Sequence, residues 1–133
     1  MKQVIEFLNE NCVGYLATTD NGEPRTRPWR FLFEEEGKFY FCTENTKDVF
    51  RQLQSNLSIE FSATSKDYTI LRIRGNVTFC KTSIEKMKVI EKDNVIQAAY
   101  QTPDNPIFEV FYLEHGEAFM SDLLDPMKKK IEF

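Results

Sequence analysis

The chain has 133 residues, 41% of them hydrophobic and 14% aromatic, which is enough to close one core and too few for two ordinary domains, so we expect a single domain over residues 1–133. Its formal charge of −4 and pI near 5.1 provide no general basic surface, which argues against nucleic acid or an anionic membrane as a partner. Any anion-binding site must therefore be local.

The first residues have helical periodicity. Apolar side chains between Met1 and Leu8 recur at helical spacing with charged residues on the other face, which predicts a short amphipathic helix ending near Asn11. Glu6 and Glu10 interrupt any apolar run, so this segment resembles neither a signal peptide nor a membrane span, and we expect a cytoplasmic protein.

Three short strands follow. Residues 13–18 and 25–33, joined by the turn 19–22, form a predicted hairpin, because Asn-Gly in the turn tolerates positive backbone angles. A second turn over 34–37 leads into the aromatic strand 38–42, which completes a predicted three-stranded meander.

The polar segment 43–47 leads into a predicted helix that ends near residues 55–56. Its apolar face is supplied by Val49, Phe50 and Leu53. Either Asn45 or Thr43 can cap the start of this helix by accepting a hydrogen bond from a backbone N–H group.

The middle of the chain predicts a strand pair over 57–63 and 68–80. Gly75 is expected to mark a bulge in the second strand. Arg72 and Arg74 share one face of that strand, where they either bind a second anion or pair with acids across the sheet, with the ion pairs favoured.

Thr82, followed three residues later by Glu85, is a capping-box signature and predicts a helix to about Asp93. Pro103 and Pro106 then mark a loop.

The C-terminal part predicts a last hairpin, with strands 107–114 and 117–121 and a turn at 115–116. Residues 123–133 add an edge strand. The lysine run 128–130 is interpreted as a solvated edge that discourages strand pairing rather than as a polyanion site.

About six or seven strands with two or three inserted helices favour a β-barrel of the α+β class over a doubly wound sheet. The three cysteines are odd in number and widely spaced in apolar stretches, which predicts reduced core thiols rather than disulfides or a zinc site. They are Cys12, Cys42 and Cys80. We expect no bound metal.

One group of residues suits a phosphate. Arg25 and Arg27 alternate on one strand, and Lys47 lies at the start of the helix after a neighbouring strand, whose terminus adds unpaired N–H donors. Hydroxyl and amide groups are added by Thr43, Asn45 and Thr46. The residues alone leave a second interpretation open, in which the arginines are solvated and pair with acids such as Glu23.

Several motifs occur in a recognisable order. They are Gly14-Tyr15-Leu16-Ala17-Thr18, Asp20-Asn21-Gly22, Pro24-Arg25-Thr26-Arg27-Pro28, Gly37-Lys38-Phe39-Tyr40-Phe41-Cys42-Thr43, Thr46-Lys47 and Gln52-Leu53. Their order and spacing resemble the pyridoxamine 5'-phosphate oxidase-like FMN-binding split-barrel family, most densely over residues 1–80. Within that family the chain is most similar to the short proteins grouped with nitroimidazole-resistance proteins.

The resemblance implies a six- to seven-stranded split barrel and a homodimer with two FMN molecules at the subunit interface. The phosphate would be held by residues matching Arg25, Thr43, Thr46 and Lys47, with the backbone of 26–28 beside the flavin ring. The full set of expected cofactor-binding residues is Arg25, Thr26, Arg27, Pro28, Cys42, Thr43, Asn45, Thr46, Lys47 and Gln52. Trp29 either stacks near the ring or packs in the core, with the core favoured.

The function that we expect is an FMN-dependent oxidoreductase that passes electrons from a small-molecule donor to a small electrophilic acceptor, nitroaromatic or quinone-like. The alternatives are a non-catalytic FMN carrier or stress-related flavin binder, and a barrel that holds haem or a deazaflavin. No catalytic residue is assigned, since the only histidine, His115, lies in a predicted exposed turn. Oxidation of pyridoxamine phosphate is not expected, because enzymes with that activity carry a C-terminal arginine, and this chain has none after Arg74.

Overall fold

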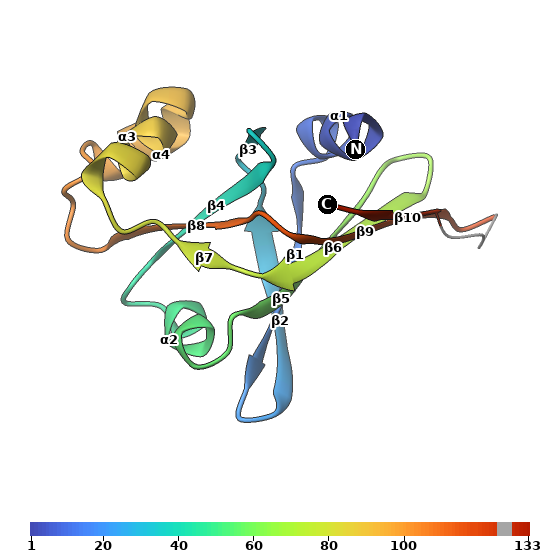
Figure 1. Cartoon of the computed structure of the whole chain (residues 1–133), viewed down its shortest axis with the longest axis horizontal. Helices are drawn as coiled ribbons and strands as arrows, with labels where there is room; N and C mark the ends of the chain where they lie inside the picture. The colour runs from blue at the N-terminus through green and yellow to red at the C-terminus, as the bar shows by residue number, and fades with distance from the viewer. Residues whose placement is uncertain (125–128) are drawn as a thin grey trace.

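The computed structural model describes residues 1–124 and 129–133 (Figure 1). Its helices are α1 (Lys2–Glu10), α2 (Asp48–Ser55), α3 (Ser83–Lys92) and α4 (Asn94–Tyr100). Its strands are β1 (Val13–Asp20), β2 (Glu23–Arg30), β3 (Phe33–Glu35), β4 (Lys38–Glu44), β5 (Ser58–Thr64), β6 (Thr69–Asn76), β7 (Thr78–Phe79), β8 (Phe108–Leu113), β9 (Gly116–Asp122) and β10 (Lys129–Glu132). The expected strand count is too low, because the segments 25–33 and 68–80 each divide into two strands of different sheets.

The strands form two sheets in which every described pair is antiparallel. One sheet has the order β10-β9-β6-β5-β1-β2, and the other has the order β3-β4-β8-β7. The chain crosses between the sheets four times, and neither sheet closes on itself within the described part of the chain. This arrangement confirms a split barrel of the α+β class with inserted helices.

Two predicted connections are wrong. The strand β4 pairs with β3 and β8 rather than with β2, so the expected meander is interrupted where Phe31 is buried and the chain changes sheet. The expected last hairpin is also absent from the described residues, because β8 pairs with β4 and β7, whereas β9 pairs with β6 and β10. Both errors concern the partner of a strand, and strand periodicity does not specify the partner.

Gly75 marks a close approach of two backbones rather than a bulge. It stays in register with Ile59 on one side and Gly116 on the other. A Cβ atom on Gly75 would lie 2.5 Å from the backbone oxygen of His115, so a side chain does not fit there.

The core between the two sheets is rich in phenylalanine. The rings of Phe41 and Phe111 stack with centroids 5.5 Å apart, and Phe61 packs on Phe41 at 5.4 Å. The predicted amphipathic helix is confirmed as α1, which adds Val4, Phe7 and Leu8 to this core, whereas Met1 is exposed. A second apolar cluster lies between the pair α3–α4 and the four-stranded sheet.

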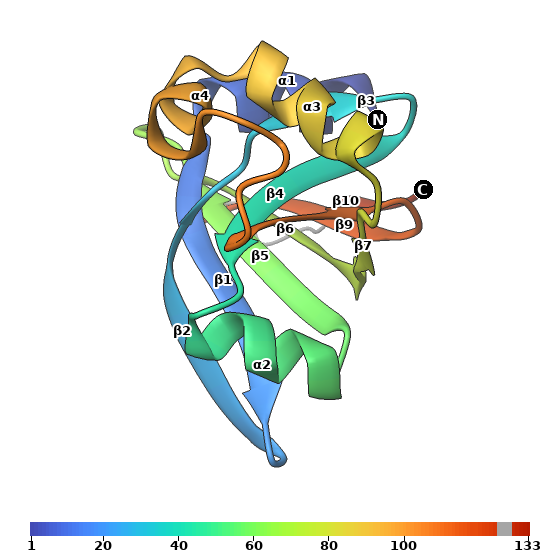
Figure 2. The ribbon, with the colours of Figure 1, turned by 90° about the vertical axis from the view of Figure 1, so that its left-hand side faces the viewer.

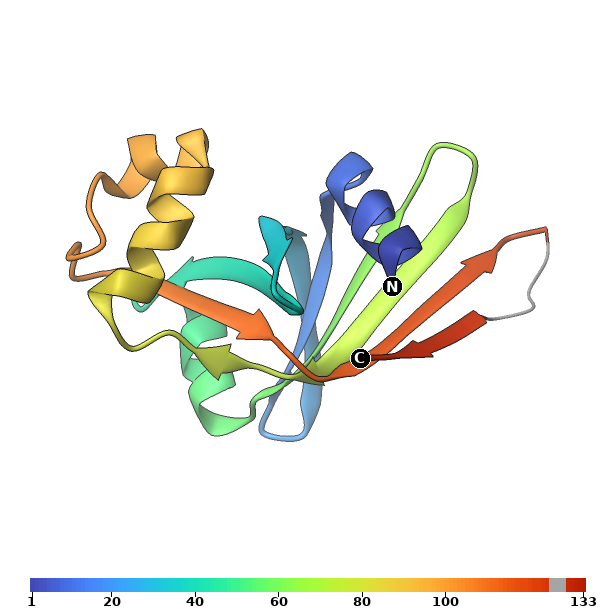
Figure 3. The ribbon, with the colours of Figure 1, turned by 45° about the horizontal axis from the view of Figure 1, so that its top comes forward.

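Helices α3 and α4 form a pair at one end of the molecule, opposite the β9–β10 hairpin (Figure 3). The helix predicted from the capping-box signature is confirmed as α3. The Thr82 hydroxyl accepts a hydrogen bond from the backbone N–H of Glu85, but the Glu85 carboxylate accepts from the Thr82 hydroxyl rather than from the Thr82 backbone N–H. Helix α4 follows after Asp93 and was not anticipated as a separate helix.

The C-terminal edge strand is confirmed for residues 129–132, while residue 128 of the lysine run lies outside the described residues. The three cysteines are free thiols, as expected, and Cys80 is buried. No helix among the described residues is long and apolar enough to cross a bilayer.

Candidate functional site

Strand β2 runs beside α2 and below α4 (Figure 2), and several of its residues line two hollows. The tight turn before it places Asn21 and Gly22 at φ values of 50° and 81°, as the Asn-Gly signal predicts. The resulting register sets Arg25 opposite Thr18 and Arg27 opposite Leu16, so both arginines lie on the face toward α2. No further strand pairs with β2 among the described residues.

The start of α2 forms the opposite border. Lys47 is its N-cap residue, and no side chain caps the helix, so the expected cap by Asn45 or Thr43 is wrong. Asn45 instead holds the loop before β8. Its backbone N–H donates to the oxygen of Ile107 at 2.9 Å, and its side-chain amide donates to the oxygen of Pro106 at 2.7 Å. The first N–H groups of α2 are therefore free of side-chain acceptors.

Between these borders lies a hollow of about 350 Å³, which we call the cation hollow. It is lined by Asp20, Arg25, Thr26, Arg27, Trp29, Lys47, Asp48, Val49 and Gln52. Three cationic side chains thus converge on one space with two carboxylates at its rim. This composition suits a small anion that can compete with the carboxylates.

A second hollow of about 350 Å³, the aromatic hollow, continues from the first toward α4. It is lined by Val13, Pro28, Trp29, Arg30, Leu32, Cys42, Thr43, Lys47, Ile96 and Tyr100. Trp29 and Lys47 line both hollows, and the Lys47 Nζ lies 5.5 Å from the centre of the Trp29 ring. The two hollows are therefore neighbours that share the Lys47–Trp29 contact as a common wall, and we call them together the groove, with a charged end and an apolar end.

The Arg27 guanidinium forms hydrogen bonds to groups within the protein. Its guanidinium donates to the Thr18 hydroxyl and to Gln52 Oε1, both at 2.8 Å, and to the oxygen of Leu16 at 3.2 Å. The Thr18 hydroxyl donates to the same Gln52 oxygen at 2.6 Å. Burial lowers the pKa of Arg27, while the charge of Asp48 opposes that shift. The network fixes β2 against β1 and α2.

Arg25 and Lys47 are more available. The Arg25 guanidinium is 45% exposed and lies 3.3 Å from Glu23 and 3.8 Å from Asp20, which are surface ion pairs of small energy. Lys47 forms no ion pair with any residue that the structure describes. These two cations can turn toward a ligand at little cost.

Thr43 carries the clearest unsatisfied group of the groove. The residue is 1% exposed, and its hydroxyl has no hydrogen-bond partner among the described residues. A buried hydroxyl without a partner costs about 1–3 kcal/mol. Thr43 contributes to the wall of the aromatic hollow, but its hydroxyl oxygen is buried, so a ligand in the hollow reaches it only after the side chain rotates.

The expected cofactor-binding residues divide into three groups. Those in the cation hollow are Arg25, Thr26, Arg27, Lys47 and Gln52. Those in the aromatic hollow are Pro28, Cys42, Thr43 and again Lys47. Asn45 and Thr46 line neither hollow.

Helix α4 contributes Ile96 and Tyr100 to the aromatic hollow, and neither residue is among those expected from the sequence, because the helix itself is not predicted. Trp29 is half-buried and packs against the core, as favoured, and it also lines both hollows. The pairing of Arg72 with Glu60 at 3.3 Å agrees with the interpretation as ion pairs.

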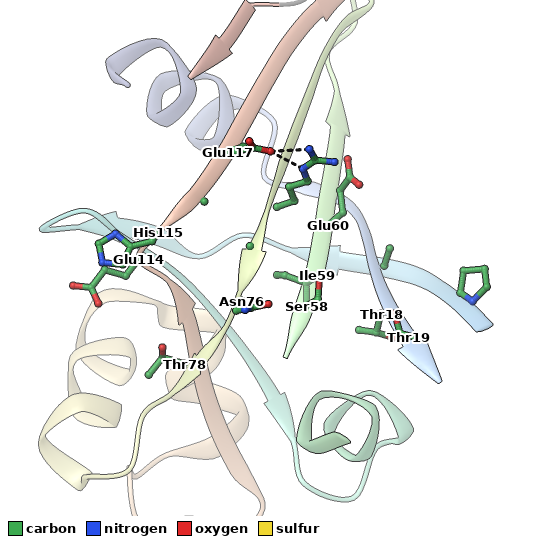
Figure 4. A pocket seen from close by; sticks show the side chains of 15 residues that line it. Thr18, Thr19, Ser58, Ile59, Glu60, Asn76, Thr78, Glu114, His115 and Glu117 are labelled. Carbon is green, nitrogen blue, oxygen red and sulfur yellow. Dashed lines mark hydrogen bonds and ion pairs between the residues drawn. The ribbon is translucent and has the colours of Figure 1, made fainter. Parts of the chain in front are cut away.

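A third and larger hollow, of about 820 Å³, lies where β5, β6 and the β8–β9 junction meet (Figure 4). Arg74 and Glu117 at its wall satisfy each other at 2.7 and 2.9 Å. His115 at its rim is exposed, as expected for a turn residue. No cluster of metal-ligating side chains occurs within residues 1–124 and 129–133.

A sequence profile described as pyridoxamine 5'-phosphate oxidase matches residues 1–120. No curated protein matches the chain at a significant level. The crystal structure of a NimC/NimA family protein from Clostridium acetobutylicum is 32% identical, with a TM-score of 0.90 over 100% of this chain and 92% of that one.

Two more distant structures share the fold. A heme binding protein from Mycobacterium smegmatis is 16% identical, with a TM-score of 0.77 over 98% of this chain and 56% of that one. A pyridoxamine 5'-phosphate oxidase-related, FMN binding protein from Nostoc punctiforme is 12% identical, with a TM-score of 0.68 over 99% and 93%. With the profile match over most of its length, the chain belongs to the pyridoxamine 5'-phosphate oxidase family.

Proposed function

We propose that the protein binds FMN along the groove, with the phosphate in the cation hollow and the flavin ring in the aromatic hollow. The observation that carries this proposal is that the two hollows are neighbours and share Trp29 and Lys47 in their linings. A phosphate and a flat apolar ring joined by a short polar chain match a groove whose charged end leads directly into an apolar end.

Arg25 and Lys47 would hold the phosphate together with the uncapped N–H groups of α2. Arg27 would act indirectly, because its donors are already used by Thr18, Gln52 and Leu16. The unpartnered Thr43 hydroxyl would gain a polar partner from the cofactor after a rotation of its side chain, because its oxygen is buried. Thr46, exposed in the turn before α2, could contribute only after a change of its side-chain position.

The proposed reaction is the reduction of a small electrophilic acceptor by a reduced nicotinamide. FMN, when bound, supplies the two-electron exchange between donor and acceptor. For a nitro group the balance is two electrons and two protons in, and a nitroso group and one water out. A hydride from the donor brings both electrons and one proton, and solvent brings the second proton. The chain's part is to bind, orient and shield the reactants, and no side chain is assigned as acid or base.

We further propose that the protein is a cytoplasmic homodimer with FMN at the interface. Val13 and Tyr15 are 65% and 61% exposed on the outer face of β1, and Pro28 lies opposite Tyr15 on the same face. Val13 and Pro28 also line the aromatic hollow, so this apolar patch is continuous with the groove. A second copy on this face would cover the patch and the open side of the ring end together.

A non-catalytic FMN carrier is the alternative, and turnover distinguishes the two. With reduced nicotinamide and a nitroaromatic or quinone acceptor, the enzyme should be faster than an equal concentration of free FMN. Equal rates would leave binding as the only function. Haem, which the name of the Mycobacterium smegmatis neighbour suggests, and a deazaflavin are distinguished from FMN by the absorption spectrum of the purified protein.

The test of binding is a fluorescence titration with FMN. Arg25→Ala combined with Lys47→Ala should cost about 2–5 kcal/mol of affinity, because two charged contacts to the phosphate are lost. The matched control is Lys66→Ala with Lys81→Ala, which removes the same charge from exposed positions outside the groove. Unchanged affinity in the folded groove variant would refute the proposed phosphate site.

A further inference from the structure

Asp20, the last residue of β1, places a carboxylate in the lining of the cation hollow. Its side chain is 18% exposed and lies between two guanidinium groups. Oδ1 accepts a hydrogen bond from Arg51 of α2 at 3.2 Å, and Oδ2 lies 3.8 Å from Nε of Arg25 on β2. A negative charge of the protein itself is therefore held beside the arginine that is proposed to bind the phosphate.

Arg51 acts on the hollow only through this carboxylate. It is absent from the lining, its side chain is 57% exposed, and its one ion pair within residues 1–124 and 129–133 is the pair with Asp20. A guanidinium keeps its charge at every ordinary pH. Arg51 therefore cancels the charge of Asp20 from the solvent side, while the other oxygen of the carboxylate stays turned toward Arg25.

The charges of the site balance a phosphate only when Arg51 is included. Three cationic and two acidic side chains line the cation hollow, a formal sum of +1. A phosphate monoester carries about −1.5 to −2 charges at pH 7, so the lining alone leaves excess negative charge. With Arg51 as the partner of Asp20 the sum becomes +2 and matches a dianion. A change of one charge beside the hollow acts about twice as strongly on a dianion as on a monoanion, because the Coulomb energy is proportional to the ligand charge.

We propose that Arg51, acting through Asp20, makes the cation hollow selective for a phosphate dianion over a monoanion of the same shape. The inference rests on the proposed function, because it concerns the phosphate end of the bound flavin. Arg51 is a positioning residue that holds the Asp20 carboxylate and cancels its charge. Without Arg51, Asp20 would be free to pair fully with Arg25 and would compete with the phosphate for it. A sulfate ester or a phosphodiester, each with a single charge, would lose less affinity.

The experiment titrates FMN and riboflavin 5'-sulfate into flavin-free protein and compares the two Kd values. The sulfate ester has the shape of the phosphate ester and one charge fewer at about pH 8, where the phosphate is a dianion. Wild-type protein should prefer FMN. At low salt, Arg51→Ala should weaken FMN binding by about three- to tenfold and sulfate-ester binding by only about two- to threefold, so that the preference narrows. Arg51→Lys keeps the charge and should keep the preference within about twofold.

A double mutant tests whether Arg51 works through Asp20. Asp20→Asn removes the charge, keeps the size of the side chain, and should tighten FMN binding more than sulfate-ester binding. Once Asp20→Asn is present, Arg51→Ala should cost less than about twofold, because no carboxylate is left for Arg51 to neutralise. Glu23→Gln is the matched control for Asp20→Asn, since Glu23 also pairs with Arg25 but is 71% exposed and does not line the hollow. Lys81→Ala, exposed outside the groove, is the control for Arg51→Ala.

The same titrations separate this inference from the proposed function. If wild-type protein binds no FMN, the proposed function fails and this inference with it. If FMN binds but wild-type protein shows no preference for it over the sulfate ester, or Arg51→Ala leaves the preference unchanged, only the inference is overturned. A cost of Arg51→Ala that is as large with Asp20→Asn as without it also overturns the inference, because Arg51 would then act without Asp20. Arg51→Gln, which is uncharged and long, replaces the alanine variant if that variant unfolds.

Discussion

Arg25 and Arg27 lie two residues apart on one strand face, yet their guanidinium groups have different surroundings. Arg27 donates to three acceptors on β1 and α2, whereas Arg25 faces solvent and two surface carboxylates. The alternation predicts the shared face correctly. It does not distinguish a structural arginine from an available one, because the acceptor Gln52 is brought to Arg27 only by the packing of α2.

The two arginines should differ in how much they contribute to the free energy of unfolding. Arg27→Ala should lower the free energy of unfolding by about 1–3 kcal/mol, because Gln52 and Thr18 lose a buried charged donor. Arg25→Ala should change it by less than about 1 kcal/mol, since its ion pairs are exposed. Urea unfolding of the flavin-free proteins measures both. Equal losses would mean that the Arg27 network contributes little to the fold.

The role of Asn45 could not be predicted from its neighbours in the sequence. A polar residue just before a helix is a good candidate for a cap, and the sequence around Asn45 contains nothing against it. Its amide is nevertheless bound to the 106–109 segment, about sixty residues away along the chain. Only the pairing of β4 with β8, which the sequence does not specify, brings these groups together.

At the scale of elements, the contact between Arg30 and Asp93 should make the stability of the α4 region depend on pH. Burial alone would raise the pKa of Asp93, but hydrogen bonds from Arg30 and from the N–H of Ile96 outweigh it, and the pKa lies below its ordinary value. A carboxyl with a lowered folded pKa stabilises the fold above its unfolded pKa, near about 3.9, and the contribution disappears as the pH falls through the folded pKa.

Asp93→Asn isolates this contribution, because asparagine caps a helix about as well as aspartate. The variant should be less stable by about 1–3 kcal/mol at pH 7, since Arg30 loses its charged partner. The difference from wild type should stay constant down to about pH 5 and shrink below about pH 4. Chemical unfolding at several pH values checks both statements. A difference that grows toward low pH would contradict the assigned pairing.

Gly116, the first residue of β9, is paired with Gly75 of β6, and the two backbones approach each other closely at this point. A Cβ atom on Gly116 would lie 2.1 Å from the backbone oxygen of Arg74. Gly116→Ala should therefore force the strands apart and cost about 3 kcal/mol. Gly22→Ala is the control, because nothing lies within 4 Å there and only the φ of 81° is strained, at about 1 kcal/mol. In thermal unfolding, Gly116→Ala should lower the melting temperature more than Gly22→Ala does.

The elements themselves were largely predictable, and their partners were not. Strand periodicity and turn residues located both segments of the supposed last hairpin, but a hairpin and a crossing between sheets have the same local pattern. The capping-box signature of Thr82 and Glu85 predicts helix α3 from the local sequence alone. Helix α4 is capped by Asp93 with no glutamate three residues later, so the sequence signal for its start is weaker. Without this helix, the contribution of Ile96 and Tyr100 to the aromatic hollow could not be predicted.

For the whole molecule, the proposed dimer makes a prediction about Tyr15. Tyr15→Glu places a charge in the apolar patch of β1 and should weaken self-association at least about tenfold, because a carboxylate would be buried on assembly. Tyr68→Glu is a matched control, since Tyr68 is 60% exposed at a distant turn. Sedimentation velocity over a range of protein concentrations measures the effect. A wild-type protein that stays monomeric, or equal behaviour of both variants, would contradict the dimer surface.

Thermal stability connects the groove to the fold as a whole. A ligand that binds only the folded protein stabilises it by about 2.7 kcal/mol at a hundredfold excess over its Kd, which raises the melting temperature of a domain of this size by about 10 °C. FMN should produce such a shift. Riboflavin has the same ring and lacks the phosphate, so it should produce a much smaller shift at the same concentration.

The difference between the two flavins measures the cation hollow alone. Arg25→Ala with Lys47→Ala should remove most of that difference, because the variant can no longer distinguish a phosphate from a hydroxyl. Tyr100→Ala should leave it intact, since Tyr100 lies at the other end of the groove. If Tyr100→Ala also erased the preference for FMN, the assignment of phosphate and ring to opposite ends would be wrong.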